Sequence, residues 1–177
     1  MKSLEDIIKV SARTAISRKT ASKPTRLLEA KGLLRGLIID YGCGKGADVE
    51  YLKEKGYKVV GFDPNYRPTY SLLVPNTYDT VLCNYVLNVV PPKIRHEILK
   101  KIHLILKCGG KAFITVRDIS EGKIGGTPYE DGVITSRGTF QKLFTPKELV
   151  GLVSQYFDDV MIISRRQPLT VVGVKRC

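Results

Sequence analysis

One acid and three glycines form the part of this sequence best suited to hold a ligand. An apolar run, 37–39, is followed by Asp40 and then by Gly42, Gly44 and Gly46. Glycine adopts backbone angles closed to other residues and lets a ligand approach main-chain N–H groups, because no Cβ is in the way. This order of residues predicts a buried strand that leads into a cofactor-binding loop.

The elements around this loop are readable from the residues that follow. Residues 47–55 are helical in pattern, with apolar Val49 and Leu52 and a glycine stop at Gly56. A second strand, 57–62, then ends at another acid, Asp63. An acid at that position can accept hydrogen bonds from both hydroxyls of a ribose. We therefore expect a strand–loop–helix–strand unit.

The stretch Asp40 to Gly46, taken with Asp63, resembles the S-adenosylmethionine (SAM) site of class I methyltransferases, since the spacing is G-x-G-x-G rather than the G-x-G-x-x-G of dinucleotide folds. The resemblance implies that Asp40 holds the methionine ammonium and Asp63 the ribose. Lys45 and Asp48 are also similar to the G-K-G and following Asp of mRNA cap guanine-N7 methyltransferases, although each could equally be a solvated helix charge. The residues expected to bind SAM are Asp40, Gly42, Cys43, Gly44, Lys45, Gly46, Asp48, Asp63, Pro64, Asn84, Tyr85 and Val86.

By the same resemblance, residues 82–90 lie where the fourth strand of such enzymes meets the sulfonium. DNA and RNA amino-methyltransferases commonly carry [DNS]-P-P-[YFW] there, and this chain does not, which argues against that mechanism. Asn84, Tyr85 and Asn88 are the candidate catalytic residues, as groups that orient the substrate. The alternative is ordinary packing at the end of a strand.

The rest of the chain predicts an α/β, Rossmann-like class I methyltransferase sheet, mostly parallel. Residues 64–77 hold three prolines, so the third strand is expected to be reduced or absent. A helix over 92–107 and a strand over 111–116 follow. Strands over 159–165 and 169–174 predict a C-terminal antiparallel hairpin.

Two segments invite a functional interpretation. Residues 119–138 form a long Gly-rich stretch, predicted as an unstructured loop, and such loops are often functional. A helical pattern over 3–18 and a basic stretch over 17–25 precede the first strand. We expect a single domain, 1–177, whose N-terminal 1–35 is a helical basic extension or lid and whose catalytic core is 36–177.

Several blocks resemble the methyltransferases associated with DNA phosphorothioation systems. They are residues 14–18 with 22–24, 40–44, 84–89 and 131–142. The resemblance implies SAM-dependent transfer in a nucleic-acid setting. Basic and hydroxyl side chains in these blocks could grip a phosphate or close over the acceptor. The candidate substrate-binding residues are Arg18, Lys19, Arg137, Thr139, Gln141 and Lys142.

Composition supports a polyanionic partner without requiring one. The chain has 29 Lys plus Arg against 17 Asp plus Glu, a net charge of +12, and half of that excess precedes residue 36. The alternative is a charge that serves only solubility. The four cysteines form no C-x-x-C pair and have no His cluster beside them, so neither a metal site nor a disulfide framework is expected, and a reducing cytoplasm is the default. Every apolar run is too short to span a membrane.

The sequence thus predicts a cytoplasmic methyltransferase that moves a methyl group from SAM, leaving S-adenosylhomocysteine (SAH), to DNA or RNA. Two alternatives stay open: an acceptor that is a small molecule or protein, and a SAM-binding regulatory protein without catalysis. No metal or membrane is expected, and the oligomeric state is open.

Overall fold

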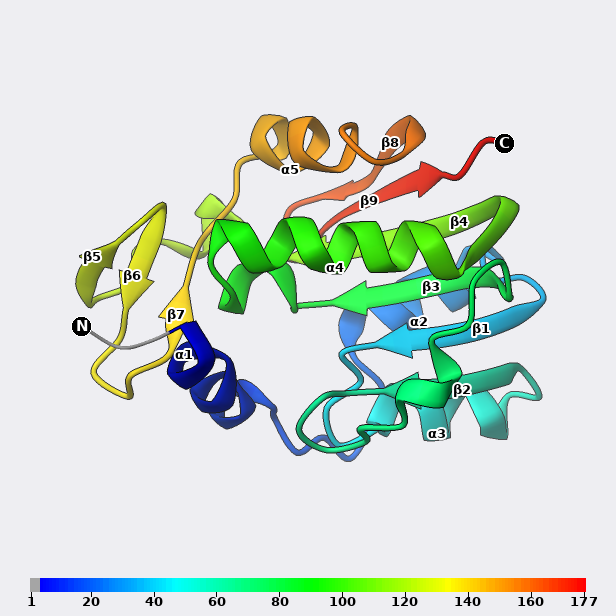
Figure 1. Ribbon diagram of the computed structural model, residues 1–177, viewed down its shortest axis with the longest axis horizontal. Helices are drawn as coiled ribbons and strands as arrows, with labels where there is room; N and C mark the ends of the chain where they lie inside the picture. The colour runs from blue at the N-terminus through cyan, green and yellow to red at the C-terminus, as the bar shows by residue number, and fades with distance from the viewer. Residues whose placement is uncertain (1–3) are drawn as a thin grey trace.

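The computed structural model describes residues 4–177 and contains a six-stranded sheet with helices on both faces (Figure 1). The strand order is β2-β1-β3-β4-β9-β8. The first four strands are parallel to one another, β9 pairs antiparallel with β4, and β8 pairs antiparallel with β9. The helices are α1 (Leu4–Ser11), α2 (Lys23–Ala30), α3 (Ala47–Glu54), α4 (Pro92–Ile105) and α5 (Pro146–Val153). The sheet strands are β1 (Leu37–Tyr41), β2 (Lys58–Phe62), β3 (Tyr78–Asn84), β4 (Leu106–Val116), β8 (Asp158–Arg165) and β9 (Leu169–Val174).

Alternation along the strands divides the core into two layers, because successive strand side chains point to opposite faces. Ile39 belongs to the layer that α4 and α5 cover, with Leu99 and Leu149 from those helices. Its neighbour Ile38 belongs to the other layer, covered by α2 and α3 through Leu28 and Leu52. Both faces of the sheet are therefore buried, as the near-continuous apolar strands require.

The predicted reduction of the sheet is confirmed. Residues 64–77 contain a single short helical turn, η2 (Tyr70–Leu72), and β2 is an edge strand. The C-terminal hairpin is also confirmed, because β8 and β9 pair antiparallel and β9 pairs with β4. The fold class is thus the one that the sequence predicts.

The prediction of an unstructured loop over 119–138 is wrong. This region begins with a short turn, η4 (Ile119–Glu121), and then forms a second, antiparallel sheet of β5 (Thr127–Tyr129), β6 (Gly132–Ile134) and β7 (Phe140–Gln141). Gly132 is needed in it, because a Cβ there would lie 2.5 Å from the Phe140 ring. Figure 1 shows this small sheet beside α1, beyond the carboxyl end of β3.

The predicted helix over 92–107 ends earlier, at Ile105, and β4 begins at Leu106. The expectation about cysteines also needs correction, because Cys108 and Cys177 form a disulfide. The β4–β9 register explains the pairing: Lys111 lies opposite Val174, and continuing that ladder outward brings residue 108 to residue 177. Spacing in the sequence does not reveal a pairing that the sheet register creates.

The N-terminal extension is more broken than its periodicity suggests. α1 gives way at Ser11 to a short turn, η1 (Ala12–Thr14), and the chain is extended from Ala15. Residue 3 of the predicted helix lies outside the described residues. α2 has Pro24 in its first turn and Ser22 as its N-cap. The division at residue 35 stays a prediction.

Candidate active site

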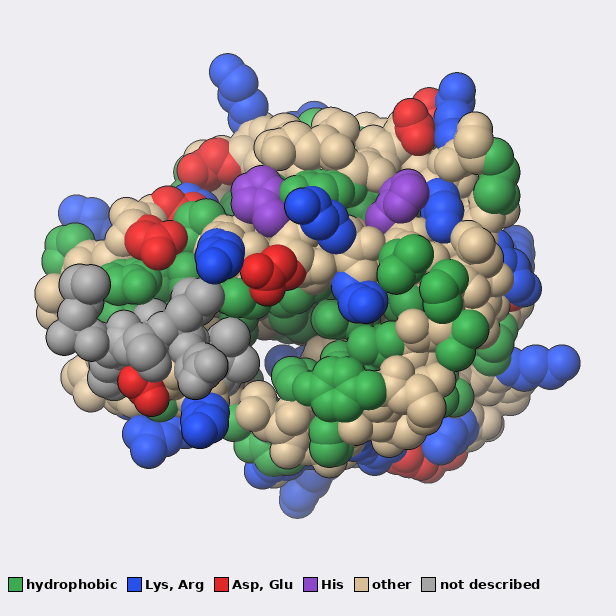
Figure 2. Space-filling model, in the orientation of Figure 1, with side chains coloured by type: hydrophobic (Ala, Val, Ile, Leu, Met, Phe, Trp, Pro, Cys, Tyr) green, Lys and Arg blue, Asp and Glu red, His purple; other side chains and the backbone are tan. Residues whose placement is uncertain are grey.

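A cavity of about 780 Å³ lies at the carboxyl ends of the parallel strands. Its walls come from the loop after β1, the residues that follow β2, β3 and β4, the N-terminal residues 11–18, and residues 135–141 next to the small sheet. Ligands in open α/β sheets bind at this edge of the sheet. Figure 2 shows this face of the molecule hollowed near its centre, with hydrophobic side chains along part of the rim.

The loop after β1 is a glycine cradle. Gly42, Gly44 and Gly46 all have positive φ, at 83°, 52° and 88°. The main-chain N–H groups of Gly42 and Cys43 donate to the carbonyl of Phe62, which ties the loop to the end of β2. A Cβ on Gly42 would lie only 2.3 Å from the Val86 side chain. The loop therefore tolerates no side chain at Gly42.

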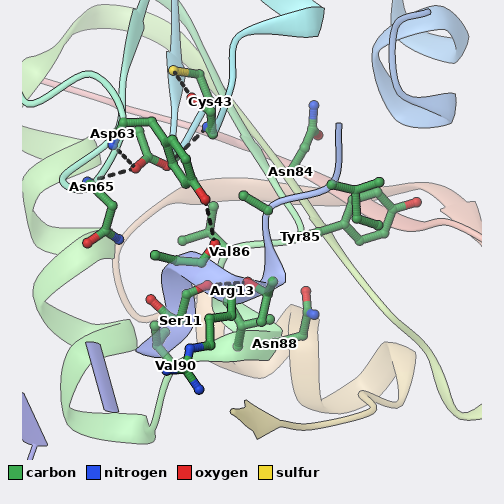
Figure 3. Close-up of a pocket in the computed structure, with 18 of the residues that line it drawn as sticks. Ser11, Arg13, Cys43, Asp63, Asn65, Asn84, Tyr85, Val86, Asn88 and Val90 are labelled. Carbon is green, nitrogen blue, oxygen red and sulfur yellow. Dashed lines mark hydrogen bonds between the residues drawn. The ribbon is translucent and has the colours of Figure 1, made fainter. Parts of the chain in front are cut away.

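Asp63 braces this cradle from β2. Its Oδ2 accepts a hydrogen bond from the Gly44 N–H at 3.0 Å. Its Oδ1 accepts from the N–H groups of Asn65 and Tyr66, at 2.8 and 3.0 Å (Figure 3). A carboxylate has about four acceptor positions, so capacity remains for a ligand hydroxyl.

Asp40 lies beneath the cradle, 2% exposed, and its carboxyl forms no hydrogen bond with the residues that the structure describes. Burial raises the pKa of this carboxyl well above its ordinary value, and the nearby charges of Asp48 and Asp63 raise it further. A cationic ligand group placed beside Asp40 would relieve both effects.

The Asp48 carboxylate bonds to other side chains of the protein, although the sequence predicts that it contacts the cofactor. Its carboxylate accepts hydrogen bonds from the Ser22 N–H and hydroxyl, from the Thr25 hydroxyl at 2.6 Å, and from the Asn84 amide at 3.2 Å. This buried network fastens α2 to α3 and to the end of β3. Asp48 and Asn84 do border the cavity, but the Asn84 side chain points away from Asn88 in Figure 3. Their cofactor and catalytic roles stay predictions.

The other two catalytic candidates follow β3 directly. Tyr85 has φ +60°, unusual for a residue with a Cβ, and the Arg18 guanidinium lies 5.7 Å from its ring centre. Asn88 is in the turn η3 (Leu87–Val89) and is 1% exposed. Both residues line the cavity.

The N-terminal segment 11–18 lies across the cofactor loop. The Tyr66 hydroxyl donates to the Ala12 carbonyl at 2.9 Å, and Lys45 Nζ donates to the Ser17 hydroxyl at 2.7 Å. A Cβ on Gly44 would meet Ala15 at 3.5 Å. Because the Lys45 amine bonds to Ser17, any contact of Lys45 with the cofactor would come from its main chain. The segment lies where a lid would, and its motion stays a prediction.

The predicted substrate-binding residues divide into two groups. Arg18, Arg137, Thr139 and Gln141 line the cavity. Lys142 binds Glu148 instead, at 3.0 Å, and lies over the Phe144 ring. Lys19 borders a separate shallow hollow beside α3. The cavity gathers the first group only.

Sequence reasoning missed several residues of the cavity. Arg117 follows β4 directly and pairs with Glu121 at 2.7 Å. The rule that residues after parallel strands face the site could have found it. Tyr66 lies in the proline-rich segment after Asp63 and lines the cavity. Its neighbour Arg67 does not line the cavity, but the Arg67 guanidinium donates to the Lys45 carbonyl at 3.4 Å. That segment carries no local signal for such contacts.

Within residues 4–177, the structure groups no three His, Cys, Asp or Glu side chains in a way that could hold a metal ion. In the same part of the chain, every helix is too short or too polar to cross a membrane.

Comparison with known proteins places the chain in a family. Residues 12–156 match the family described as "Methyltransferase domain". The chain belongs to this methyltransferase family. Among curated proteins, none matches the chain.

Solved structures with the same fold include SAM-dependent methyltransferases. The 1,6-didemethyltoxoflavin-N1-methyltransferase of Burkholderia thailandensis, solved with SAH, has a TM-score of 0.64 at 19% identity, over 96% of this chain and 80% of that one. A SAM-dependent methyltransferase of Archaeoglobus fulgidus has a TM-score of 0.62 at 16% identity, over 85% and 91%. One from Bacteroides fragilis, also with SAH, has 0.59 at 15%, over 90% and 80%. At these identities the likeness concerns the fold alone.

The protein is a SAM-dependent methyltransferase, and its residues fit that cofactor. The glycine cradle forms part of the cavity wall, and its positive φ angles favour glycine at all three positions. Asp40 offers a buried carboxyl that lacks a partner among the described residues, suited to the methionine ammonium, and Asp63 offers acceptor capacity to the ribose. SAM supplies a methyl group on a positively charged sulfur.

Proposed function

We propose that this methyltransferase acts on a small molecule that enters the cavity beside Asn88. The observation that carries the proposal is the part of the cavity bordered by residues 11–18 and residues 135–141, which we call the chamber. Ligand cavities of about 300–1,000 Å³ hold small molecules, and 780 Å³ gives room for a cofactor and a compact acceptor.

The chain's own residues contribute mainly by positioning. The cradle and Asp63 orient the cofactor, and the walls after β3 hold the acceptor in line with the sulfur. Well-oriented reactants can gain roughly 7–11 kcal/mol from proximity. Burial raises the pKa of the Tyr85 hydroxyl, so this group stays protonated near neutrality and serves as a hydrogen-bond donor rather than a base.

A direct test uses the purified protein with methyl-labelled SAM and separate pools of small metabolites, DNA, RNA and protein. We expect label to appear in the small-molecule pool. Label in a macromolecular pool alone would contradict the proposal. The structural neighbour that is a 1,6-didemethyltoxoflavin-N1-methyltransferase bears on the fold only. The proposal of a small-molecule acceptor therefore rests on the cavity.

A nucleic acid is the second candidate acceptor, and charge is the observation that favours it. The chain carries +12, and Arg18 and Arg137 border the cavity. The resemblance to methyltransferases associated with DNA phosphorothioation points the same way. Against it, Figure 2 shows Lys and Arg spread around this face rather than gathered at the hollow. We therefore rank it second.

A further inference from the structure

The side-chain oxygen of Asn88 is buried and has no hydrogen-bond partner in residues 4–177. Asn88 is 1% exposed, and its Oδ1 accepts no hydrogen bond from the described residues. The residue nevertheless lines the cavity, where Figure 3 shows it near Val90 and Arg13. Native structures pair nearly all such atoms, because an unpaired buried polar group is costly. A ligand that brings a donor would satisfy Oδ1.

The segment that carries Asn88 is held in place from two sides. The main-chain carbonyl of Asn88 accepts a hydrogen bond from the Lys142 N–H at 2.9 Å. The carbonyl of Leu87, the residue before it, accepts from Arg95 Nε at 2.8 Å. These bonds tie η3 to the β7 end of the small sheet and to α4. The Asn88 amide therefore projects from a fixed backbone, as a selective site requires.

The cavity wall that contains Asn88 also has apolar side chains and hydroxyls that are already paired. Val89, Val90 and Ile94 form a small hydrophobic cluster that lines the same cavity. The hydroxyls of Thr135 and Thr139, also in the wall, bond to each other at 2.8 Å. This wall thus offers apolar surface together with an unmet hydrogen-bond acceptor, Asn88 Oδ1.

We propose that Asn88 selects the methyl acceptor, which is a small, largely apolar molecule with an N–H or O–H group that donates to Asn88 Oδ1. This inference rests on the proposed function, because it requires a small molecule in the chamber. The apolar cluster supplies affinity for the body of that molecule. The amide oxygen supplies discrimination, since a site built around a hydrogen bond rejects analogues that lack the donor.

The test measures binding of matched fragments to the SAH-loaded protein by titration calorimetry or ligand-observed NMR. Indole is compared with benzofuran, and phenol with fluorobenzene, because each pair keeps its shape while one member lacks the donor. We expect indole and phenol to bind about tenfold or more tightly than their partners. In Asn88→Leu the two members of each pair should bind equally.

Two variants serve as controls. Asn88→Asp keeps an acceptor oxygen and should keep the preference for the donor-bearing member. Thr77→Val removes a hydroxyl that lies outside the cavity, and should also keep it. SAH affinity, measured in every variant, reports whether the fold and the cofactor site are intact.

Equal affinities within each pair for the parent would overturn the inference, as would a preference that survives Asn88→Leu. Failure of all four fragments to bind a protein that binds SAH would also overturn it. The proposed function fails by a different result: methyl transfer to nucleic acid or protein and to no small molecule.

Discussion

The carboxylate of Asp63 has two tasks at the residue scale. It accepts hydrogen bonds from the Gly44 N–H in the cofactor loop and from the Asn65 and Tyr66 N–H groups after β2, and it is the acid expected to hold the ribose. Loss of the side chain should therefore affect both the loop and the ligand.

Asp63→Ala should weaken SAH binding about ten- to a hundredfold, because a hydrogen bond to a charged group contributes about 1.5–3 kcal/mol. Asp63→Asn, which keeps one acceptor oxygen, should lose less. Glu97→Ala, an exposed acid on α4, is the control and should bind as the parent does. Calorimetry checks all three, and an unchanged affinity for Asp63→Ala would remove its assigned role.

Asp40 leads to a prediction about pH. Its pKa in the folded protein is raised, first by burial and then by Asp48 and Asp63. Between the unfolded value of about 4 and the folded value, the folded state holds a proton that the unfolded chain has released. The free energy of unfolding of the cofactor-free protein should therefore fall as pH rises through this interval.

Asp40→Asn removes that titration, so its stability should decline less than the parent's as pH rises above about 4. The difference in stability between the variant and the parent should stop changing above the folded pKa, because Asp40 is then ionised in both the folded and the unfolded parent. Denaturant unfolding at a series of pH values measures it. If the unfolding free energies of parent and variant change in parallel with pH, then burial does not raise the pKa of Asp40.

At the scale of elements, the cofactor unit could be predicted and the acceptor wall could not. The strands around the cradle have local patterns: an apolar run, an acid and glycines at positions such as Gly42. The wall over 127–141 depends on β6 pairing with β5 and β7 and on Arg95, which is buried in α4 and binds Asp131. Those contacts join residues far apart in sequence, and no local pattern announces them.

The same division holds within the site. Asp40 and Asp63 were predictable because each ends an apolar strand beside glycines. The internal partners of Asp48 were not, since Ser22 and Thr25 reach it only after α2 packs on α3. The prediction of a loop failed because tertiary pairing, rather than local propensity, determines the small sheet.

Two glycines with nearly equal backbone angles allow a test of the cradle. Gly42 and Gly56 have φ of +83° and +85°, but only at Gly42 would a Cβ collide, with Val86. Gly56→Ala should cost about 1–2 kcal/mol of unfolding free energy from backbone strain alone. Gly42→Ala should cost about 1–3 kcal/mol more, because overpacking is added, and should also weaken SAH binding. Denaturant unfolding of both proteins compares them, and equal losses would argue against the close packing of the loop.

At the scale of the whole molecule, the salt dependence of binding can test whether the net charge of +12 serves to bind nucleic acid. If nucleic acid is the acceptor, binding should weaken steeply with rising salt, because phosphate contacts release counterions. Charge reversal at Arg18, Lys19 and Arg137 should then weaken oligonucleotide binding and flatten its salt dependence, while SAH affinity changes little.

Fluorescence anisotropy with DNA and RNA at several salt concentrations measures this. A triple variant that binds as the parent does would exclude this surface as the acceptor site and strengthen the small-molecule proposal. Reversal at the exposed Lys100 on α4, a residue that does not border the cavity, is the matched control and should reduce binding less.

The position of residues 11–18 has a kinetic consequence. These residues contact the cofactor loop at Lys45 and the Tyr66 hydroxyl, so a cofactor on the cradle has protein above it. If this segment acts as the predicted lid, we expect departure of spent SAH to require it to separate from the loop first. The turnover rate at saturation would reflect that opening step, which depends on the protein and not on acceptor concentration. Different acceptors would accordingly share one limiting rate while differing in the concentration needed to reach it.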